Sequence, residues 1–223
     1  MKFTSCTPKQ EKEKTDCAAE LRTRGCAVCN HVVKTTRDFL AHWQYALASD
    51  EKAQSEFAGE LGFCPTHMWQ LHDMSSSWGE SIGFPRLFEH ISELVDRAEP
   101  WPIERIIHRP QTCRVCKMLR ETESAYVADL RDFLSDASGR ECYSRRPGVC
   151  LRHLGQLLVI SPPDLRSFLQ RETSKSFRKL AAEMYNYAAK REAVRRDLIK
   201  RDEEDAALRA LIHIASAEDY SAS

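Results

Sequence analysis

Apolar residues recur every three or four positions through most of the chain, and this spacing is typical of amphipathic helices. The first such stretch runs from Ala27 to about Ala48, with apolar residues at Val28, Val32, Phe39, Leu40, Trp43 and Leu47. The same spacing predicts further helices at about 50–61, from 65 onward, at 85–97, from 113 onward and from 150 onward. No stretch alternates apolar and polar residues as a strand does, so we predict an all-α fold.

Several residues indicate where these helices begin and end. Asp50 is suited to an N-cap, because its carboxylate can accept from the first free backbone N–H groups, and Gly62 is suited to the stop that follows. Pro65 directly follows Cys64 and favours the first helical position, where its missing N–H costs nothing. Cys64 would then be the N-cap of its helix.

Cysteine and histidine form one pattern that occurs twice. Each copy has a Cys-x2-Cys pair and, roughly 34 residues later, a Cys-x2-His pair. The copies are Cys26, Cys29, Cys64 and His67, and then Cys113, Cys116, Cys150 and His153. The nearly equal spacing predicts two pseudo-repeated helical halves, each carrying four metal ligands.

A Cys-x2-Cys turn brings two thiolates within reach of one ion, and a Cys-x2-His pair at a helix start adds a sulfur and a nitrogen. Three sulfurs and one nitrogen make a closed tetrahedral set that is common in structural zinc sites. We therefore predict two Zn²⁺ ions, with two iron–sulfur clusters as the alternative. Covalent haem attachment is excluded, because Asn30 and Lys117 stand where that motif requires histidine.

Two ways of pairing the ligands remain open. Duplication favours closure within each repeat, where an outgoing and a returning helix would fit between Cys29 and Cys64. In the other pairing, the first Cys-x2-Cys pair joins Cys150 and His153 and the halves interlock. We expect the first arrangement.

Turn-forming residues divide the rest of the chain. Pro100 and Pro102 interrupt helix formation and stiffen the connection between the halves. We therefore predict a polar N-terminal segment, two metal-binding repeats and C-terminal helices packed on them, at residues 1–22, 23–99, 100–161 and 162–223. Within these we expect a loop at 75–83, one long helix or two in series at 165–200, and a last helix opened by Asp202 and Asp205.

Composition and charge narrow the functional classes. The 223 residues contain 33 Lys plus Arg and 33 Asp plus Glu, so no global positive field attracts nucleic acid or an anionic membrane. The first twenty residues lack a signal-like apolar run, and no apolar stretch is long enough to cross a membrane. A cytoplasmic location follows as an expectation. In that compartment, Cys-x2-Cys pairs indicate metal or redox sites more than disulfides.

A basic run at 190–201 is the main candidate for nucleic-acid contact. Its basic residues are Lys190, Arg191, Arg195, Arg196, Lys200 and Arg201. A solvated helix flank, balanced by the acidic residues at 202–205, is the simpler interpretation. The histidines outside the repeated pattern have no ligand-like spacing, and no nucleophile–base or phosphate-binding motif occurs, so we predict no catalytic residue.

The doubled pattern resembles a group of bacterial helical proteins catalogued as domains of unknown function. The resemblance covers about residues 21–215 and rests on the eight ligands with Gly62 and Gly148, and more weakly on residues 185–210. It departs from that group at Ala27, where a proline would be expected after the first cysteine. The resemblance implies the helical architecture and the metal sites but no activity.

Three functional hypotheses follow. The first is a non-enzymatic zinc-stapled accessory or adaptor protein that binds a protein partner through its helical faces. The second is an electron-transfer or redox-sensing protein with two Cys3His-ligated iron–sulfur clusters. The third is a regulator that binds nucleic acid through the 190–201 run.

Overall fold

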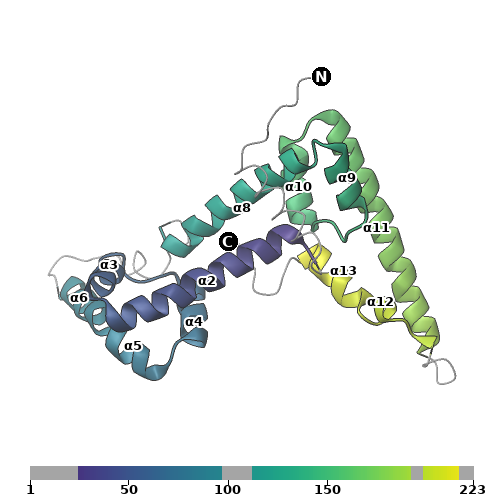
Figure 1. Ribbon diagram of the computed structural model, residues 1–223. Helices are drawn as coiled ribbons and strands as arrows, with labels where there is room; N and C mark the ends of the chain where they lie inside the picture. The colour runs from purple at the N-terminus through teal and green to yellow at the C-terminus, as the bar shows by residue number, and fades with distance from the viewer. Residues whose placement is uncertain (1–24, 97–111, 192–197, 216–223) are drawn as a thin grey trace. The chain divides into compact units, whose positions relative to one another are not determined.

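The computed structural model describes residues 25–96, 112–191 and 198–215, which form helices and contain no strand (Figure 1). The helices are α2 (Ala27–Ser49), α3 (Glu51–Gly59), α4 (Pro65–Met74), α5 (Ser77–Gly83), α6 (Pro85–Val95), α8 (Arg114–Phe133), α9 (Ala137–Ser144), α10 (Leu151–Ile160), α11 (Pro163–Lys190), α12 (Arg201–Glu204) and α13 (Ala206–Ala215). The predicted all-α fold is confirmed for these ranges.

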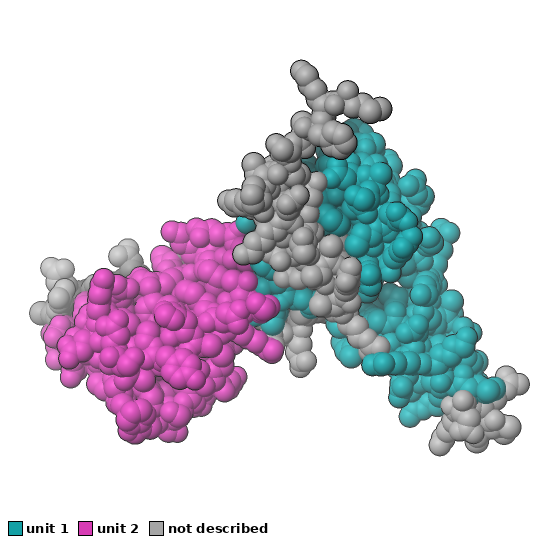
Figure 2. All heavy atoms as spheres, viewed as in Figure 1, with its two compact units in different colours: residues 1–33, 123–220 teal, residues 34–122, 221–223 magenta. Residues whose placement is uncertain are grey.

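The chain divides into two compact units (Figure 2). Unit 1 comprises residues 1–33 and 123–220, and unit 2 comprises residues 34–122 and 221–223. Both units are therefore discontinuous in sequence. The start of α2 and the end of α8 belong to unit 1, while their other ends belong to unit 2.

Unit 2 is built around aromatic side chains. Helix α3 packs on α6, and the ring of Phe57 lies edge-on to that of Phe63, with centroids 5.1 Å apart. Trp43 joins them from α2, with its ring centroid 5.7 Å from that of Phe63. The guanidinium of Arg114 lies 4.8 Å from the centre of the Trp43 ring, so the start of α8 docks on the same cluster.

Unit 1 is organised by the long helix α11, which packs against α10, α12 and α13 (Figure 1). Its residues Leu165 and Leu169 are fully buried, as is Leu157 of α10, which is in contact with α11. Two ion pairs link α11 to the C-terminal helices: Lys190 lies 2.7 Å from Glu203, and Arg209 lies 2.6 Å from Glu183.

Several predicted helix ends are confirmed. The Asp50 side chain accepts a hydrogen bond from the backbone N–H of Lys52, as expected of an N-cap. Cys64 is the N-cap of α4, and Pro65 occupies the first helical position. Gly62 has φ +72°, a conformation in which a side chain is strained, and its Cα-bound hydrogen faces Leu87 closely.

Other local predictions are wrong. The expected loop at 75–83 contains α5, whose N-terminus is capped by the Ser76 hydroxyl. The stretch after α8, for which no helix was predicted, forms α9, and α11 ends at Lys190, with residues 192–197 outside the described ranges. Asp202 lies inside α12, which begins at Arg201, whereas the last helix, α13, begins directly after Asp205, whose carbonyl oxygen accepts a hydrogen bond from the Arg209 N–H.

Candidate metal centres

The eight predicted ligands form two groups. The Cys26 site consists of Cys26, Cys29, Cys150 and His153, and the Cys64 site consists of Cys64, His67, Cys113 and Cys116. In each group all four ligand atoms lie within 4.8 Å of one another. The expectation that each repeat closes its own site is therefore wrong, because each Cys-x2-Cys pair meets the Cys-x2-His pair of the other repeat.

Helix length explains this pairing. Helix α2 has 23 residues and is about 34 Å long, of which about 30 Å lie beyond Cys29, whereas α3 has nine residues and spans only about 14 Å. The same mismatch holds for α8, with 20 residues, and α9, with eight. The returning helices are too short to bring Cys64 or Cys150 back to the Cys-x2-Cys pair of its own repeat.

All four ligand pairs stand at helix N-termini. The carbonyl oxygens of Cys26, Cys64, Cys113 and Cys150 each accept the first backbone hydrogen bond of their helix, at 2.8–3.0 Å. Each site therefore lies where the positive ends of two helices meet. Three thiolates with one divalent ion carry a net negative charge, which this arrangement favours.

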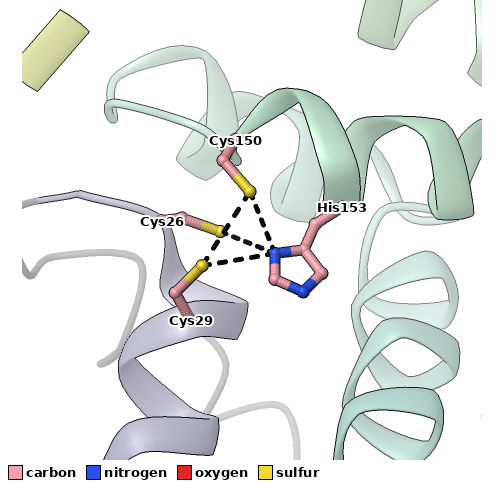
Figure 3. Close-up of side chains that lie close together, drawn as sticks. All are labelled: Cys26, Cys29, Cys150 and His153. Atoms are coloured by element: carbon pink, nitrogen blue, oxygen red, sulfur yellow. Dashed lines mark hydrogen bonds between the residues drawn. The ribbon is translucent and has the colours of Figure 1, made fainter. Parts of the chain in front are cut away.

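In the Cys26 site, the imidazole of His153 presents Nδ1 to all three sulfurs (Figure 3). The distances from Nδ1 to Sγ are 3.3 Å for Cys26, 3.4 Å for Cys29 and 3.1 Å for Cys150. The sulfurs of Cys29 and Cys150 are 3.8 Å apart. All four residues are fully buried, with 0% of their surface exposed.

The Cys64 site repeats this geometry. The distances from His67 Nδ1 to Sγ are 3.0 Å for Cys64, 3.7 Å for Cys113 and 3.4 Å for Cys116. The sulfurs of Cys64 and Cys116 are 3.7 Å apart. These ligands are also buried, although up to 6% of their surface, at Cys116, reaches solvent.

The spacing of the ligand atoms fits one tetrahedral ion per site. Zinc–sulfur bonds of about 2.3 Å and zinc–nitrogen bonds of about 2.0 Å place tetrahedral sulfurs ~3.8 Å apart and sulfur and nitrogen ~3.5 Å apart. The distances in both sites cluster around these values. The donor set and its geometry therefore suit an ion with four protein ligands and no open position.

Without metal, the ligands share protons. Burial raises the pKa of the Cys26 thiol well above its usual value, and neighbouring thiols raise it further. Burial lowers the pKa of His153, but hydrogen bonds to Cys150, Cys29 and Glu123 outweigh it and raise the pKa to about 11. In the Cys64 site, the hydrogen bond with Cys64 lowers the pKa of Cys113 to about 3 and raises that of Cys64. A bound cation would replace these protons.

Glu123 supports the Cys26 site from outside the ligand set. Its carboxylate is 5% exposed, and its Oε1 lies 2.9 Å from His153 Nε2. The same oxygen accepts hydrogen bonds from Gln156 Nε2 at 2.8 Å and Arg152 Nε at 3.2 Å. These contacts orient the imidazole so that Nδ1 faces the sulfurs.

The Cys64 site has no such support among the described residues. His67 Nε2 is buried and has no hydrogen-bond partner there. The two sites therefore have the same ligands but different surroundings.

Sequence reasoning missed Glu123, although a signal for it was present. Glu123 lies on the apolar stripe of α8, four residues after Leu119 and four before Val127. A carboxylate at such a position must have buried donors. Only the fold shows that His153 is one of them, because 30 residues separate the two.

The other candidate residues do not assemble into a site. The described cysteines form no disulfide, and Cys142 is half-buried on α9, while Cys6 and Cys17 lie outside the described residues. In the basic run, Lys190 is paired with Glu203, and Arg195 and Arg196 lie outside the described residues. The remaining basic residues of the run are Arg191, Lys200 and Arg201, which are exposed.

Comparisons with protein-family models, with curated proteins and with solved structures give no match. The resemblance to a group of bacterial helical proteins therefore stays a prediction. Within the described ranges, none of the helices combines the length and the apolar character that crossing a membrane requires.

Proposed function

We propose that this protein is a non-enzymatic helical scaffold in which each Cys3His site holds one zinc ion, and that it acts as an accessory or adaptor protein for a protein partner. The observation that carries the metal proposal is the convergence of three sulfurs and one imidazole nitrogen, twice, in buried tetrahedral groups. With four protein ligands, neither ion keeps a position for water or substrate, which is the rule for structural zinc and not for catalytic zinc.

Ligand spacing supports zinc over an iron–sulfur cluster. The ligands of a cluster bind different iron atoms, so they must stand farther apart than ligands that share one ion. Here the four ligand atoms of each site lie within 4.8 Å of one another. We therefore place a single ion, and not a cluster, at each site.

Metal analysis of protein purified without added metal tests this proposal. We expect elemental analysis by mass spectrometry to find about two zinc ions per chain, and we expect no absorption band near 400 nm. Brown protein that contains iron and inorganic sulfide would instead support the electron-transfer or redox-sensing hypothesis. Protein that folds fully with neither metal would overturn both.

Exposed aromatic residues of unit 2 support the partner-binding part. Tyr45 is 72% exposed and Trp78 is 71% exposed, and both line a hollow of about 150 Å³ at the junction of α2, α5 and α6. Aromatic side chains around a depression are typical of the residues that dominate protein–protein binding. Phe84 also lines the hollow, and its ring stacks on that of the buried Phe57, so the hollow adjoins the aromatic core.

Site-specific photo-crosslinking in the source cells tests this surface. A photoreactive phenylalanine at position 78 should give one discrete crosslinked protein, and the same residue at position 52, on the exposed start of α3, should not. Equal crosslinking from both positions, or none from position 78, would contradict an adaptor surface at this hollow.

The nucleic-acid hypothesis receives less support. Lys190 forms an ion pair with Glu203, and acidic residues of α12 directly follow the 190–201 run. Retention on DNA or RNA that weakens steeply with salt would revive it.

A further inference from the structure

A cleft of about 460 Å³ lies in unit 1, and none of the eight candidate metal ligands is among the residues that line it. It is bounded by the segment that joins α9 to α10, by the middle of α11 and by residues of α12 and α13, elements that Figure 1 shows beside α11. Its volume falls in the range of sites for small molecules. Nothing in the proposed scaffold role uses it.

Basic side chains outnumber acidic ones in the lining. The basic residues are Arg145, Arg146, Lys175, Lys179 and Arg209, and the acidic ones are Glu172, Asp202 and Asp205. Hydroxyl groups of Ser144, Thr173 and Ser176 add donors that suit an oxyanion.

Existing ion pairs show which of these charges are already used. Arg209 is held by Glu183 at 2.6 Å and by Asp205 at 3.0 Å, so it forms part of the wall. Lys175 and Lys179 reach their acidic neighbours only at 3.9 Å and 3.7 Å, with both lysines more than 70% exposed. Such long, solvated contacts are weak, and either lysine can turn to an incoming anion.

Arg146 supplies the decisive observation. Its Nε atom is buried, yet no described residue accepts a hydrogen bond from it. An N–H of a charged guanidinium that is shielded from water without an acceptor is energetically unfavourable. A planar guanidinium is also the side chain best matched to the paired oxygens of a phosphate group.

We propose that this cleft binds a small molecule carrying a phosphate group, with Arg146 as its central donor and Lys175 and Lys179 as flanking cations. The hydroxyls of Thr173 and Ser176 donate to the remaining phosphate oxygens. Asp202 stands on the opposite, α12 side of the cleft and repels the anion, so it sets a limit on affinity.

Calorimetric titration of the full metal-loaded protein with pyrophosphate, inorganic phosphate and succinate tests the proposal. We expect saturable binding of pyrophosphate that weakens as salt is raised, because the flanking lysines are exposed. Arg146→Gln should weaken it about tenfold or more, as expected for one charge-assisted bidentate contact. Asp202→Asn should strengthen it about two- to fivefold, because it removes a repulsive charge.

Arg171→Gln is the matched control. Arg171 lies on α11, as do Lys175 and Lys179, and is 68% exposed, but it does not line the cleft, so affinity should stay within about twofold. Circular dichroism and zinc content show whether each variant is folded, and the gain in Asp202→Asn cannot arise from unfolding. Absence of binding at millimolar anion, or equal loss in Arg146→Gln and Arg171→Gln, would overturn the site. Tighter binding of succinate than of either phosphate would overturn the phosphate assignment.

Discussion

Single residues decide how the two metal sites differ. A carboxylate that is 95% removed from solvent is stable only with close donors, and Glu123 has three on one oxygen. One of them is His153, whose other nitrogen faces the sulfurs. Because Glu123 holds the proton on Nε2, it would keep the lone pair of Nδ1 directed at a bound ion. His67 has no described partner for this role.

We predict that Glu123→Ala weakens metal binding at the Cys26 site about 10- to 100-fold, and that Glu123→Gln weakens it less, because the amide oxygen can still accept from His153. Competition with a chromophoric chelator should resolve two release steps in the wild type. Only the step of the Cys26 site should move in these variants.

Glu121→Gln is the control for this prediction, since Glu121 is exposed on the same helix. Its release steps should match those of the wild type. If Glu123→Ala leaves both steps unchanged, Glu123 does not support the metal.

Two glycines in neighbouring helices differ in the space around them. A Cβ on Gly139 of α9 would stand 2.0 Å from the carbonyl oxygen of Phe133, because α9 turns back sharply against the end of α8. A Cβ on Gly155 of α10 would meet nothing within 4 Å. The same substitution therefore has opposite consequences in two neighbouring helices.

We predict that Gly139→Ala destabilises the protein by about 3 kcal/mol or more, because backbone atoms must shift to relieve the overlap. Gly155→Ala should stabilise it by up to about 1 kcal/mol through helix propensity. Urea unfolding of both variants, followed by circular dichroism, measures the two effects. A loss of stability in Gly155→Ala as large as in Gly139→Ala would show that this end of α8 is not as tightly turned as described.

Electrostatics hold the C-terminal helices to α11. The hydrogen bond from Lys190, followed by that from the backbone of Lys200, lowers the pKa of Glu203 below its usual value. A carboxyl group whose pKa is lower in the folded state contributes stability above its unfolded pKa of about 4.3 and loses it as the pH falls through the folded value. The contribution should therefore be complete at pH 7.

We predict that Glu203→Gln increases amide hydrogen exchange in α12 and α13 at pH 7, after correction for intrinsic exchange rates. The difference between variant and wild type should shrink as the pH falls below about 4, since the wild-type carboxylate is then protonated as well. Any metal release in acid affects both proteins equally and therefore cancels in this difference. If the difference in exchange grows as the pH falls, the Glu203 carboxylate does not stabilise these helices in the way proposed.

Sequence patterns predicted helices well where an apolar stripe and a cap agreed, as at Asp50, Cys64 and Pro65. They failed at α5 and α9, whose compositions are rich in Ser and Gly or in charge. Both helices are short, and their stability comes from packing, as at Gly83 against Leu47 and Gly139 against Phe133. Local propensity carries little information about such contacts.

At the scale of the molecule, the ligands were predictable and their partners were not. Residue types and spacing identified all eight residues that gather in the two groups, but spacing alone does not distinguish closure within a repeat from closure between repeats. The predicted helix lengths do distinguish them, because a returning helix of 12 residues is too short to run back along the full length of an outgoing helix of 22 residues. As a result, Cys29 depends on Cys150, 121 residues later, and Cys116 on Cys64.

This pairing predicts which part of the molecule a lost ligand destabilises. Cys29→Ser should deprive the Cys26 site of its metal and raise hydrogen exchange at least tenfold in α10, although α10 is far away in sequence. Helix α4 lies closer to Cys29 in the chain but belongs to the other site, so its protection should stay near that of the wild type. Cys116→Ser should do the reverse. Because the binding energy of a structural ion is folding energy, the effect is expected to spread through the unit that contains the site. Exchange measured by mass spectrometry on peptides from 65–74 and 151–160 distinguishes the pairings, since closure within repeats would make α4, and not α10, respond to Cys29→Ser.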